Sequence, residues 1–429
     1  MSLQTTLTSR EPRGKPRREA KPHGRRSKKL LICEEALKGH TGHWYEYNKA
    51  VWEINRNDGH EVTILAHNDV EQSLVDELPA EPFFRYTNWD QIYNFPQAWK
   101  RYFGVLHHNC RVYRALNAYL RKSSGFDCVL VPTVIVYHLL AWLILARRYG
   151  GNKLNRIVLF IRNSATTYEN DESNPVFKRS TRILAWILRQ YKPLIDKGLV
   201  RLATDSHRLA REYKALAGVD LIVFPHPRSQ EALRESANPS GNGKVVMSSL
   251  GPARWEKGAH VLAQAIEILA RRANVPPIHF VIQWNHQVVA PDGSLLKLDT
   301  DKLRDTPISC EILSESLSSR EYNQRLHASD FLLLPYMRQA YYARISGVAV
   351  EAMLLGIPMV YTDDTWVAEF ADRYGAGVGF ENENAAGLAD KICEVALKVE
   401  QWRGAARRRV PTAQEYFSPD NFQRCLWEG

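Results

Sequence analysis

The segment from Ser346 to Val360 constrains this chain more than any other. A Ser-Gly pair opens a run with helical spacing, Glu351 stands about one and a half turns in, and Gly356-Ile-Pro358 leads into a strand. A helix that opens in this way presents free backbone N–H groups and the positive end of its dipole, which suits a phosphate. A carboxylate near that end can accept hydrogen bonds from sugar hydroxyls. The pattern predicts a nucleotide site, and its alternative is a buried helix whose Glu351 only caps or forms an ion pair.

A second segment points the same way. Residues 244–250 have the composition of a buried strand, a glycine-bearing turn with Arg254 and Lys257 follows, and residues 260–270 have helical spacing. Arginine offers a planar fork of donors and lysine a point charge, the two usual partners of a diphosphate. A charged turn that is merely solvated is the alternative for this segment taken alone.

Together the two motifs, residues 251–258 and 346–360, resemble the C-terminal half of GT-B glycosyltransferases, in particular the large retaining family-4 type. Residues 278–283 and 329–335 resemble the strands that lie between these motifs in that family, and the order matches over roughly 244–395. The resemblance implies an α/β fold in which two Rossmann-like doubly wound domains face each other across a cleft. It also implies transfer of a sugar from a nucleotide-diphosphate sugar.

The resemblance assigns roles to single residues. Arg254 and Lys257 would neutralise the diphosphate of the donor, which is also the leaving group. The other predicted donor-binding residues would supply backbone N–H groups to the phosphates (Ser346, Gly347, Val348), hold the ribose (Glu351) or lie near the base (Leu313 to Leu317).

One position departs from the family pattern. The family places a second carboxylate eight residues before the one matched by Glu351, where it contacts the transferred sugar, and this chain has Ala343 there, followed by Arg344. Three readings stay open: another Asp or Glu takes the role, the sugar is held differently with Arg344 as a substrate-binding candidate, or activity is lost.

The first half of the chain offers further candidates at the ends of predicted strands. The loop Gly39-His-Thr-Gly42-His43 follows the first strand, and Arg162-Asn163 follows a later one, so both should face the cleft. A flexible turn is the alternative for the loop, which lacks the Gly-x-Gly-x-x-Gly spacing of a nicotinamide enzyme. A first-domain histidine often approaches the transferred sugar in the resembled family, and we take His138 as the catalytic candidate. His43, His107 and His108 are other conceivable matches. A structural role is the alternative for all four histidines, because a lone histidine is more often structural.

Strands alternate with helical spacing along most of the chain, which predicts parallel sheets covered on both faces. Residues 68–103 lack this regularity and are expected to form an insertion over the cleft. The predicted organisation is a basic disordered tail (1–29), a Rossmann-like acceptor domain (30–225), a linker (226–243), a Rossmann-like donor domain (244–400) and a C-terminal helix that crosses back to the first domain (401–429).

The net charge of +10 is concentrated in the tail. Residues 10–29 hold ten Lys or Arg and two Glu, a net +8, which leaves +2 for everything else. We therefore expect no specific nucleic-acid partner. The tail is either solvated or attracted to an anionic surface, which is a membrane lipid headgroup or, without specificity, a nucleic acid. The acceptor is an unidentified glycan, lipid or small molecule, and no metal or other cofactor is expected.

Location follows from three further features. The six cysteines are scattered with no Cys-x-x-Cys, which indicates a reducing compartment. The N-terminus lacks the apolar core of a signal peptide, and the apolar stretch 129–146 is broken by Pro132, so it reads as a strand and a core helix. These features predict a cytoplasmic enzyme. If the basic tail contacts lipid, the enzyme would be peripheral on the cytoplasmic face of a membrane.

Two other functions remain open from the sequence. A nucleotide-sugar epimerase of similar two-domain form would turn over a UDP-sugar without an acceptor. A non-catalytic nucleotide-sugar-binding relative would account for the alanine at position 343.

Overall fold

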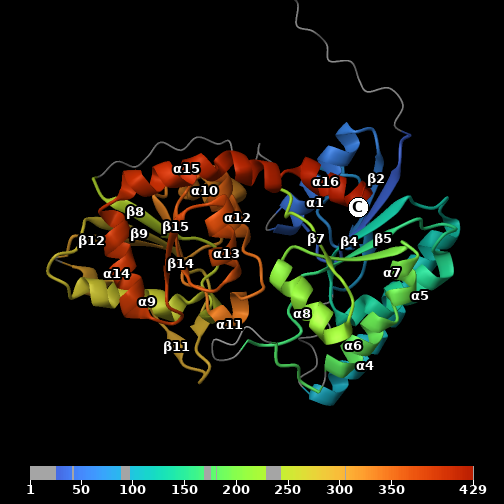
Figure 1. Cartoon of the computed structure of the whole chain (residues 1–429), viewed down its shortest axis with the longest axis horizontal. Coiled ribbons are helices and arrows are strands. Elements are labelled where there is room, and N and C mark those ends of the chain that lie inside the picture. Colours follow the sequence, from blue (N-terminus) through green and yellow to red (C-terminus); the bar gives the residue numbers. More distant parts are fainter. Residues whose placement is uncertain are drawn as a thin grey trace, which may run out of the picture.

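The computed structural model describes residues 26–40, 43–87, 97–168, 175–179, 181–228, 243–304 and 306–428. Within them the chain forms two α/β domains side by side, each with a parallel sheet between helices (Figure 1). The predicted fold class is therefore confirmed. Because residues 1–25 lie outside the described part, the expectations for the basic tail stay predictions.

The first domain has a parallel sheet in the order β3-β2-β1-β4-β5-β6-β7. Its central strands are short apolar runs such as IVLFI, buried at every position, as expected for strands covered on both faces. The strands are β1 (Lys29–Cys33), β2 (Glu61–His67), β3 (Ala80–Phe84), β4 (Cys128–Val134), β5 (Ile157–Ile161), β6 (Val200–Thr204) and β7 (Ile222–Val223).

Helices cover both faces of this sheet. They are α1 (His43–Asn57), α2 (Gln72–Glu77), α4 (Ala98–Lys122), α5 (Val136–Tyr149), α6 (Thr181–Arg189), α7 (Lys192–Asp196) and α8 (His207–Ala217). The segment 68–103, predicted to be an irregular insertion, contains α2, the edge strand β3 and the first turns of α4. The prediction was wrong there because β3 is half exposed and carries a proline, so it lacks a buried strand's pattern.

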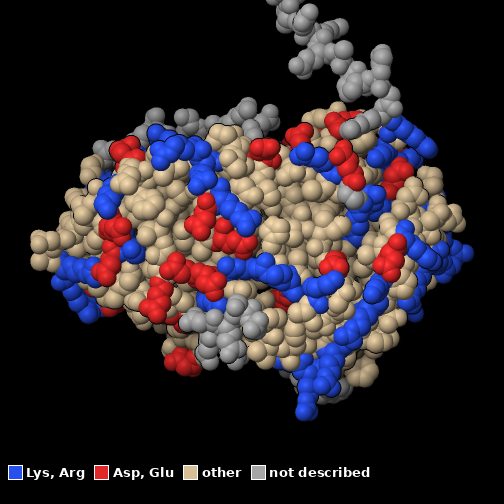
Figure 2. All heavy atoms as spheres, in the orientation of Figure 1, with Lys and Arg blue, Asp and Glu red and all other residues tan. Residues whose placement is uncertain are grey.

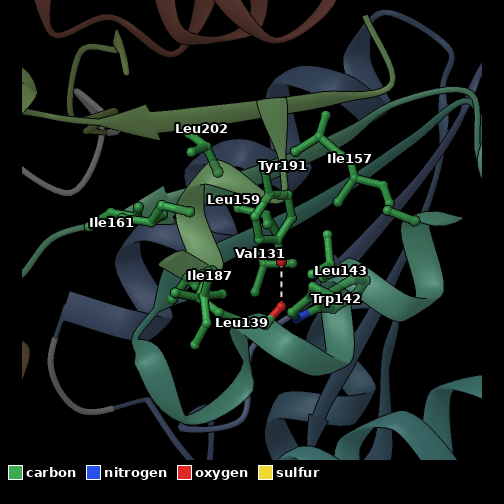
Figure 3. Packing of buried hydrophobic residues seen from close by; sticks show 14 of the residues in the cluster. Val131, Leu139, Trp142, Leu143, Ile157, Leu159, Ile161, Ile187, Tyr191 and Leu202 are labelled. Carbon is green, nitrogen blue, oxygen red and sulfur yellow. Dashed lines mark hydrogen bonds between the residues drawn. The ribbon is translucent and has the colours of Figure 1, made fainter. Parts of the chain in front are cut away.

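The core beneath α4, α5, α6 and α8 is packed with apolar side chains (Figure 3). Trp142 and Tyr191 are its largest fully buried members, and the Tyr191 hydroxyl donates a hydrogen bond to the carbonyl oxygen of Leu139. A phenol buried this deeply needs such a partner, so this bond fixes α7's start against α5.

The second domain repeats the architecture with the strand order β12-β9-β8-β13-β14-β15, again all parallel. Its strands are β8 (Val245–Ser249), β9 (Ile278–Gln283), β12 (Ile308–Leu313), β13 (Phe331–Leu334), β14 (Met359–Thr362) and β15 (Gly377–Phe380), with a separate hairpin of β10 (Val288–Val289) and β11 (Leu295–Leu296). Its helices are α9 (Ala259–Ala270), α10 (Ser319–His327), α11 (Arg338–Tyr341), α12 (Gly347–Leu355), α13 (Trp366–Tyr374), α14 (Ala385–Ala396) and α15 (Val399–Tyr416).

The last helix, α16 (Pro419–Trp427), returns to the first domain and packs beside α1 (Figure 1). Ser418 caps it by accepting a hydrogen bond from the backbone N–H of Asn421. Phe422 is fully buried in the first domain's core, and the Trp427 indole N–H donates to the Asn55 side chain over 2.8 Å. The end of the chain thus ties the two domains together.

Loops that follow strands of both sheets meet between the domains. The Arg208 guanidinium, at the start of α8, donates to Glu369 of α13 over 2.9 Å and to the carbonyl of Asp364 after β14 over 2.8 Å. Tyr168, in the loop that follows β5, packs against Tyr342 with the two rings tilted and their centroids 4.3 Å apart. Because ligands of open α/β sheets bind at the carboxyl ends of strands, this meeting region is where a site is expected.

None of the described helices is long and apolar enough to cross a membrane. The apolar stretch 129–146 forms β4 and α5, as the sequence predicts.

Candidate functional site

The turn after β8 is held in shape by two close backbone contacts. Gly258 has φ +71°, and a Cβ there would lie 1.7 Å from the carbonyl oxygen of Pro335, at the end of β13. The Gly251 N–H donates to the Gln283 side chain over 2.7 Å. Only glycine fits position 258, so the turn that carries Arg254 and Lys257 lies against the ends of β9 and β13.

Lys257 lies between this turn and the start of α12. A Cβ on Gly251 would be 2.9 Å from the Lys257 Nζ and 3.8 Å from a methyl group of Val348. Burial, together with the positive charges of Arg254 and Arg344, lowers the pKa of Lys257 to about 8, while Glu256 acts in the opposite direction. A lowered lysine pKa beside two guanidinium groups marks a place of positive potential, where an anion would be stabilised.

The two arginines are the solvent-facing part of this group. Arg254 is exposed and lies 3.7 Å from Glu256 of its own turn, and Arg344 is exposed with its guanidinium over the Tyr341 ring at 5.1 Å. An exposed ion pair of this kind contributes little, so Arg254 remains available to a stronger anion.

Helix α12 begins as predicted. The Ser346 hydroxyl accepts a hydrogen bond from the Ala349 N–H over 3.2 Å and is 3.3 Å from the Tyr336 hydroxyl. The N–H groups of Gly347 and Val348 belong to the first turn and have no intrahelical partner. A Cβ on Gly347 would meet nothing within 4 Å, so a ligand can approach this helix end closely.

Glu351 is buried, and both of its carboxylate oxygens are engaged. Oε1 accepts from the Arg228 guanidinium and Oε2 from the Tyr322 hydroxyl of α10. Burial and the Glu351 charge raise the pKa of Tyr322 well above its ordinary value, so the phenol keeps the proton that it donates. Arg228 also lies 3.9 Å from Glu46 of α1. The predicted ribose carboxylate is therefore one end of an ion pair between the domains.

The loop between β12 and α10 places Leu317 one residue before the capping Ser318 of α10. Leu317 is half-buried, and its neighbour Ser316 accepts a hydrogen bond from the Asn285 side chain over 3.2 Å. Since α10 also carries Tyr322, the partner of Glu351, this loop stands on the same side of the domain as the predicted ribose position.

The position that lacks the family's carboxylate faces the first domain. Ala343 and Tyr342 are buried in the hydrophobic cluster of that domain, and the Arg208 guanidinium lies 4.3 Å from the Tyr342 ring. The segment between β13 and α12 is therefore used for contact between the domains, which favours an apolar residue at position 343.

His138 is part of a buried cluster with Glu35 and His108. Its Nδ1 is 2.9 Å from Glu35 Oε1, and its Nε2 accepts from the Ile135 N–H over 3.2 Å, while His108 Nε2 is 3.0 Å from Glu35 Oε2. Burial alone would raise the pKa of Glu35, but the two imidazoles outweigh it and hold the pKa at about 2. Both ring nitrogens of His138 are thus engaged, and its catalytic role stays a prediction.

These three side chains have the donor types that bind metal ions, and their ligand atoms all lie within 4.8 Å of one another. The hydrogen bonding does not fit a metal, however. A metal on Nδ1 of His138 would put the proton on Nε2, where it would oppose the N–H of Ile135.

Arg162 follows β5 and is mostly buried among polar groups. Its guanidinium lies 3.6 Å from Asp205 and 4.5 Å from the Tyr47 ring centre. The backbone carbonyl of Asn163 accepts from the Tyr213 hydroxyl over 3.0 Å. Both residues lie at the carboxyl end of the sheet, as predicted, and their substrate-binding role stays a prediction.

The glycine loop after β1 is only partly described. A Cβ on Gly39 would come 2.4 Å from a Glu71 carboxylate oxygen, and the neighbouring His40 lies 3.1 Å from Glu77. Gly42 lies outside the described residues, and of His43 only the backbone, at the start of α1, is described. Carboxylates against the loop favour a hydroxyl-rich ligand there over a phosphate.

The structure brings six of the predicted residues to one place, the start of α12: Arg254, Lys257, Arg344, Ser346, Gly347 and Val348. The first-domain candidates lie in other clusters. Sequence reasoning missed Arg228, Tyr322 and Glu35, whose partners are 29 to 123 residues away along the chain. Of these three residues, only Arg228 could have been found from the sequence, because it is a charged residue at the start of a polar linker.

Comparisons with known proteins agree with this geometry. Residues 244–397 match the family described as glycosyl transferases group 1. No curated protein sequence matches the chain. Among solved structures, the whole chain is similar to sucrose-phosphate synthase from Thermosynechococcus elongatus, with 11% identity, 92% of this chain and 96% of that chain covered, and a TM-score of 0.63.

Two other structures cover 93% of this chain with a TM-score of 0.59. One is a glycosyltransferase from Rickettsia africae, 15% identical over 96% of its length. The other is the Anabaena protein HepE in complex with UDP and glucose, 13% identical over 98% of its length. The second domain of this chain therefore matches glycosyl transferases group 1, and the chain as a whole has the two-domain α/β fold of these solved structures.

Proposed function

We propose that this chain transfers a sugar from a nucleoside-diphosphate sugar to an acceptor, and that the start of α12 holds the diphosphate. The single observation that carries the proposal is the partly buried Lys257 ammonium, which lies near the guanidinium groups of Arg254 and Arg344 in a turn that packs against Val348, in the first turn of α12. Three positive side chains close to the positive end of a helix dipole repel one another, and a bound anion would remove this unfavourable electrostatic energy.

The proposed chemistry uses these groups on the leaving phosphate. Breaking the bond between the anomeric carbon and the diphosphate builds negative charge on the β-phosphate oxygens. Donors fixed in place beforehand stabilise such charge by on the order of 3 kcal/mol each. Lys257 and the Gly347 N–H would supply this stabilisation, so the proposed reaction needs no metal, and chelation with EDTA is expected to leave its rate unchanged. Retention at the anomeric carbon is proposed from the family resemblance.

Glu351 would hold the ribose while keeping its present partners. Each carboxylate oxygen accepts one hydrogen bond here, from Arg228 or from Tyr322, and has a further lone pair for a ribose hydroxyl. With Leu317 on the same side of the domain, the base would lie over the loop between β12 and α10.

The donor is tested with a thermal-shift panel of UDP-, GDP- and ADP-sugars, UDP-glucose first because HepE is described with UDP and glucose. Lys257→Ala should keep the melting temperature of the free protein and reduce turnover by about a hundredfold. The matched control is Lys297→Ala, an exposed lysine of the same domain, which should turn over like the wild type. Equal turnover in both variants contradicts the proposal.

A second candidate is a nucleotide-sugar-binding protein without transfer activity, favoured by the burial of Ala343 in the interface between the domains. Slow hydrolysis of the stabilising donor would favour the transferase, and stabilisation with no hydrolysis would favour the binder. None of the comparisons reported above is with an epimerase. For location we propose the cytoplasm, supported by six unpaired cysteines.

A further inference from the structure

Three helices cover one face of the first domain's sheet: α4, α5 and α6 pack on the same hydrophobic core. The Arg148 side chain of α5 donates to the Tyr113 hydroxyl of α4 over 3.0 Å, and the Arg147 side chain of α5 lies 3.4 Å from Gln190, at the end of α6. Their outer sides therefore form one continuous surface, here called the α4–α6 face.

The charge of the α4–α6 face is one-sided. The three helices contain ten Lys or Arg residues and no Asp or Glu. The near balance of charge outside the tail therefore hides an asymmetry, because acidic residues elsewhere offset this face. Figure 2 shows a band of Lys and Arg side chains on the side of the molecule where Figure 1 places α6.

Large apolar side chains stand among these cations. On α6, Ile183 and Trp186 are 52% and 56% exposed, and Arg182 and Arg189 are exposed on the same side of the helix. On α5, Ile144 is 47% exposed and lies one turn before Arg147 and Arg148, which are also exposed. On α4, Tyr102 and Leu106 are also more than half exposed.

We propose that the α4–α6 face binds the surface of an anionic lipid bilayer. Long basic side chains reach phosphate headgroups, while Trp and Ile insert at the boundary with the acyl chains, which is how interfacial helices bind. A protein partner of matching charge would need an acidic face, and single- or double-stranded nucleic acid gains little from isoleucines. Lipid satisfies both the charge and the exposed aliphatic groups. This inference goes beyond the proposed function, since it requires no bound donor.

The test is sedimentation of the full chain with vesicles of phosphatidylcholine alone or with about a third phosphatidylglycerol. The wild type should sediment with the anionic vesicles only, and less so as salt rises from about 0.05 to 0.5 M. Arg182→Glu with Arg189→Glu should lower the bound fraction at least about tenfold. Ile183→Ser with Trp186→Ser should lower it about fivefold or more while the salt dependence remains.

Matched controls lie on the second domain: Arg271→Glu, whose side chain is 73% exposed, and Leu397→Ser, 74% exposed, should bind like the wild type. The wild type and all variants keep the basic tail. If the tail drives binding, the α6 variants will sediment with anionic vesicles as the wild type does, and that result would overturn the proposal. No sedimentation of the wild type, or a preference for RNA over anionic vesicles, would also overturn it. None of these readouts depends on sugar transfer.

Discussion

Arg228 forms an ion pair with Glu351 and so connects the start of the predicted linker to the helix of the candidate phosphate site. Their side chains are 12% and 6% exposed. The residue predicted to hold the ribose is thus also a contact between the domains, and substitutions there should affect stability as well as binding.

Removing one member of this pair should destabilise the fold. Glu351→Gln leaves the buried Arg228 guanidinium with the more distant Glu46 as its remaining charge partner, at a cost of about 3 kcal/mol in the free energy of unfolding. Arg228→Met in the Glu351→Gln background should recover a large part of that loss. Urea unfolding of the two single variants and the double variant measures the coupling, and strictly additive losses would show that the pair contributes nothing.

Donor binding should take up a proton near pH 8. The pKa of Lys257 is lowered to about 8 in the free protein, and a bound diphosphate would raise it again. Affinity should therefore fall as pH rises above about 8, where the free ammonium loses its proton. Titration calorimetry in buffers of different ionisation enthalpy measures the uptake. Lys257→Arg should abolish it, since arginine stays charged, and an unchanged uptake would assign the proton to another group.

Gly258→Ala should be strongly destabilising. Its Cβ would come 1.7 Å from the Pro335 carbonyl oxygen, in addition to the strain of φ +71°. We expect a loss of about 2 kcal/mol or more. Gly293→Ala is the matched control, with φ +85° and no atom within 4 Å of the added Cβ. Similar melting temperatures for the two variants would mean that the turn relaxes away from β13.

Glu35→Gln should change the acid limb of the stability curve. The pKa of Glu35 is lowered from 4.5 to about 2, so its contribution is present above pH 4.5 and is lost as pH falls toward 2. The difference in unfolding midpoint between variant and wild type should be largest near pH 7 and shrink below pH 4.5. Glu81→Gln, exposed in the same domain, is the control. A difference that stays constant with pH would exclude the two imidazoles as the cause.

Local pattern was enough to predict much of the fold and the centre of the site. The run at Lys29–Cys33 forms β1, and the Ser-Gly pair at Ser346 caps and opens α12. The charged turn with Lys257 lies against that helix end because its glycines allow close packing. Each of these features depends on neighbours within a few residues, so the sequence alone carries the signal.

Contacts between distant segments could not be predicted. Nothing near His138 in the sequence indicates a partner for its ring, yet its Nδ1 is hydrogen-bonded to Glu35, 103 residues earlier. Likewise nothing near Glu351 indicates Arg228, and nothing near Ala343 indicates that the first domain's core surrounds it. These partners are fixed by how the two domains pack, which periodicity and turn signals do not encode.

The most direct test of the account is a crystal structure with the nucleoside diphosphate that stabilises the chain most. The account predicts the β-phosphate within hydrogen-bonding distance of the Lys257 Nζ and of the Gly347 and Val348 N–H groups. A diphosphate bound elsewhere, for example in the cavity of about 350 Å³ lined by Lys244, His279 and Arg325, would contradict it.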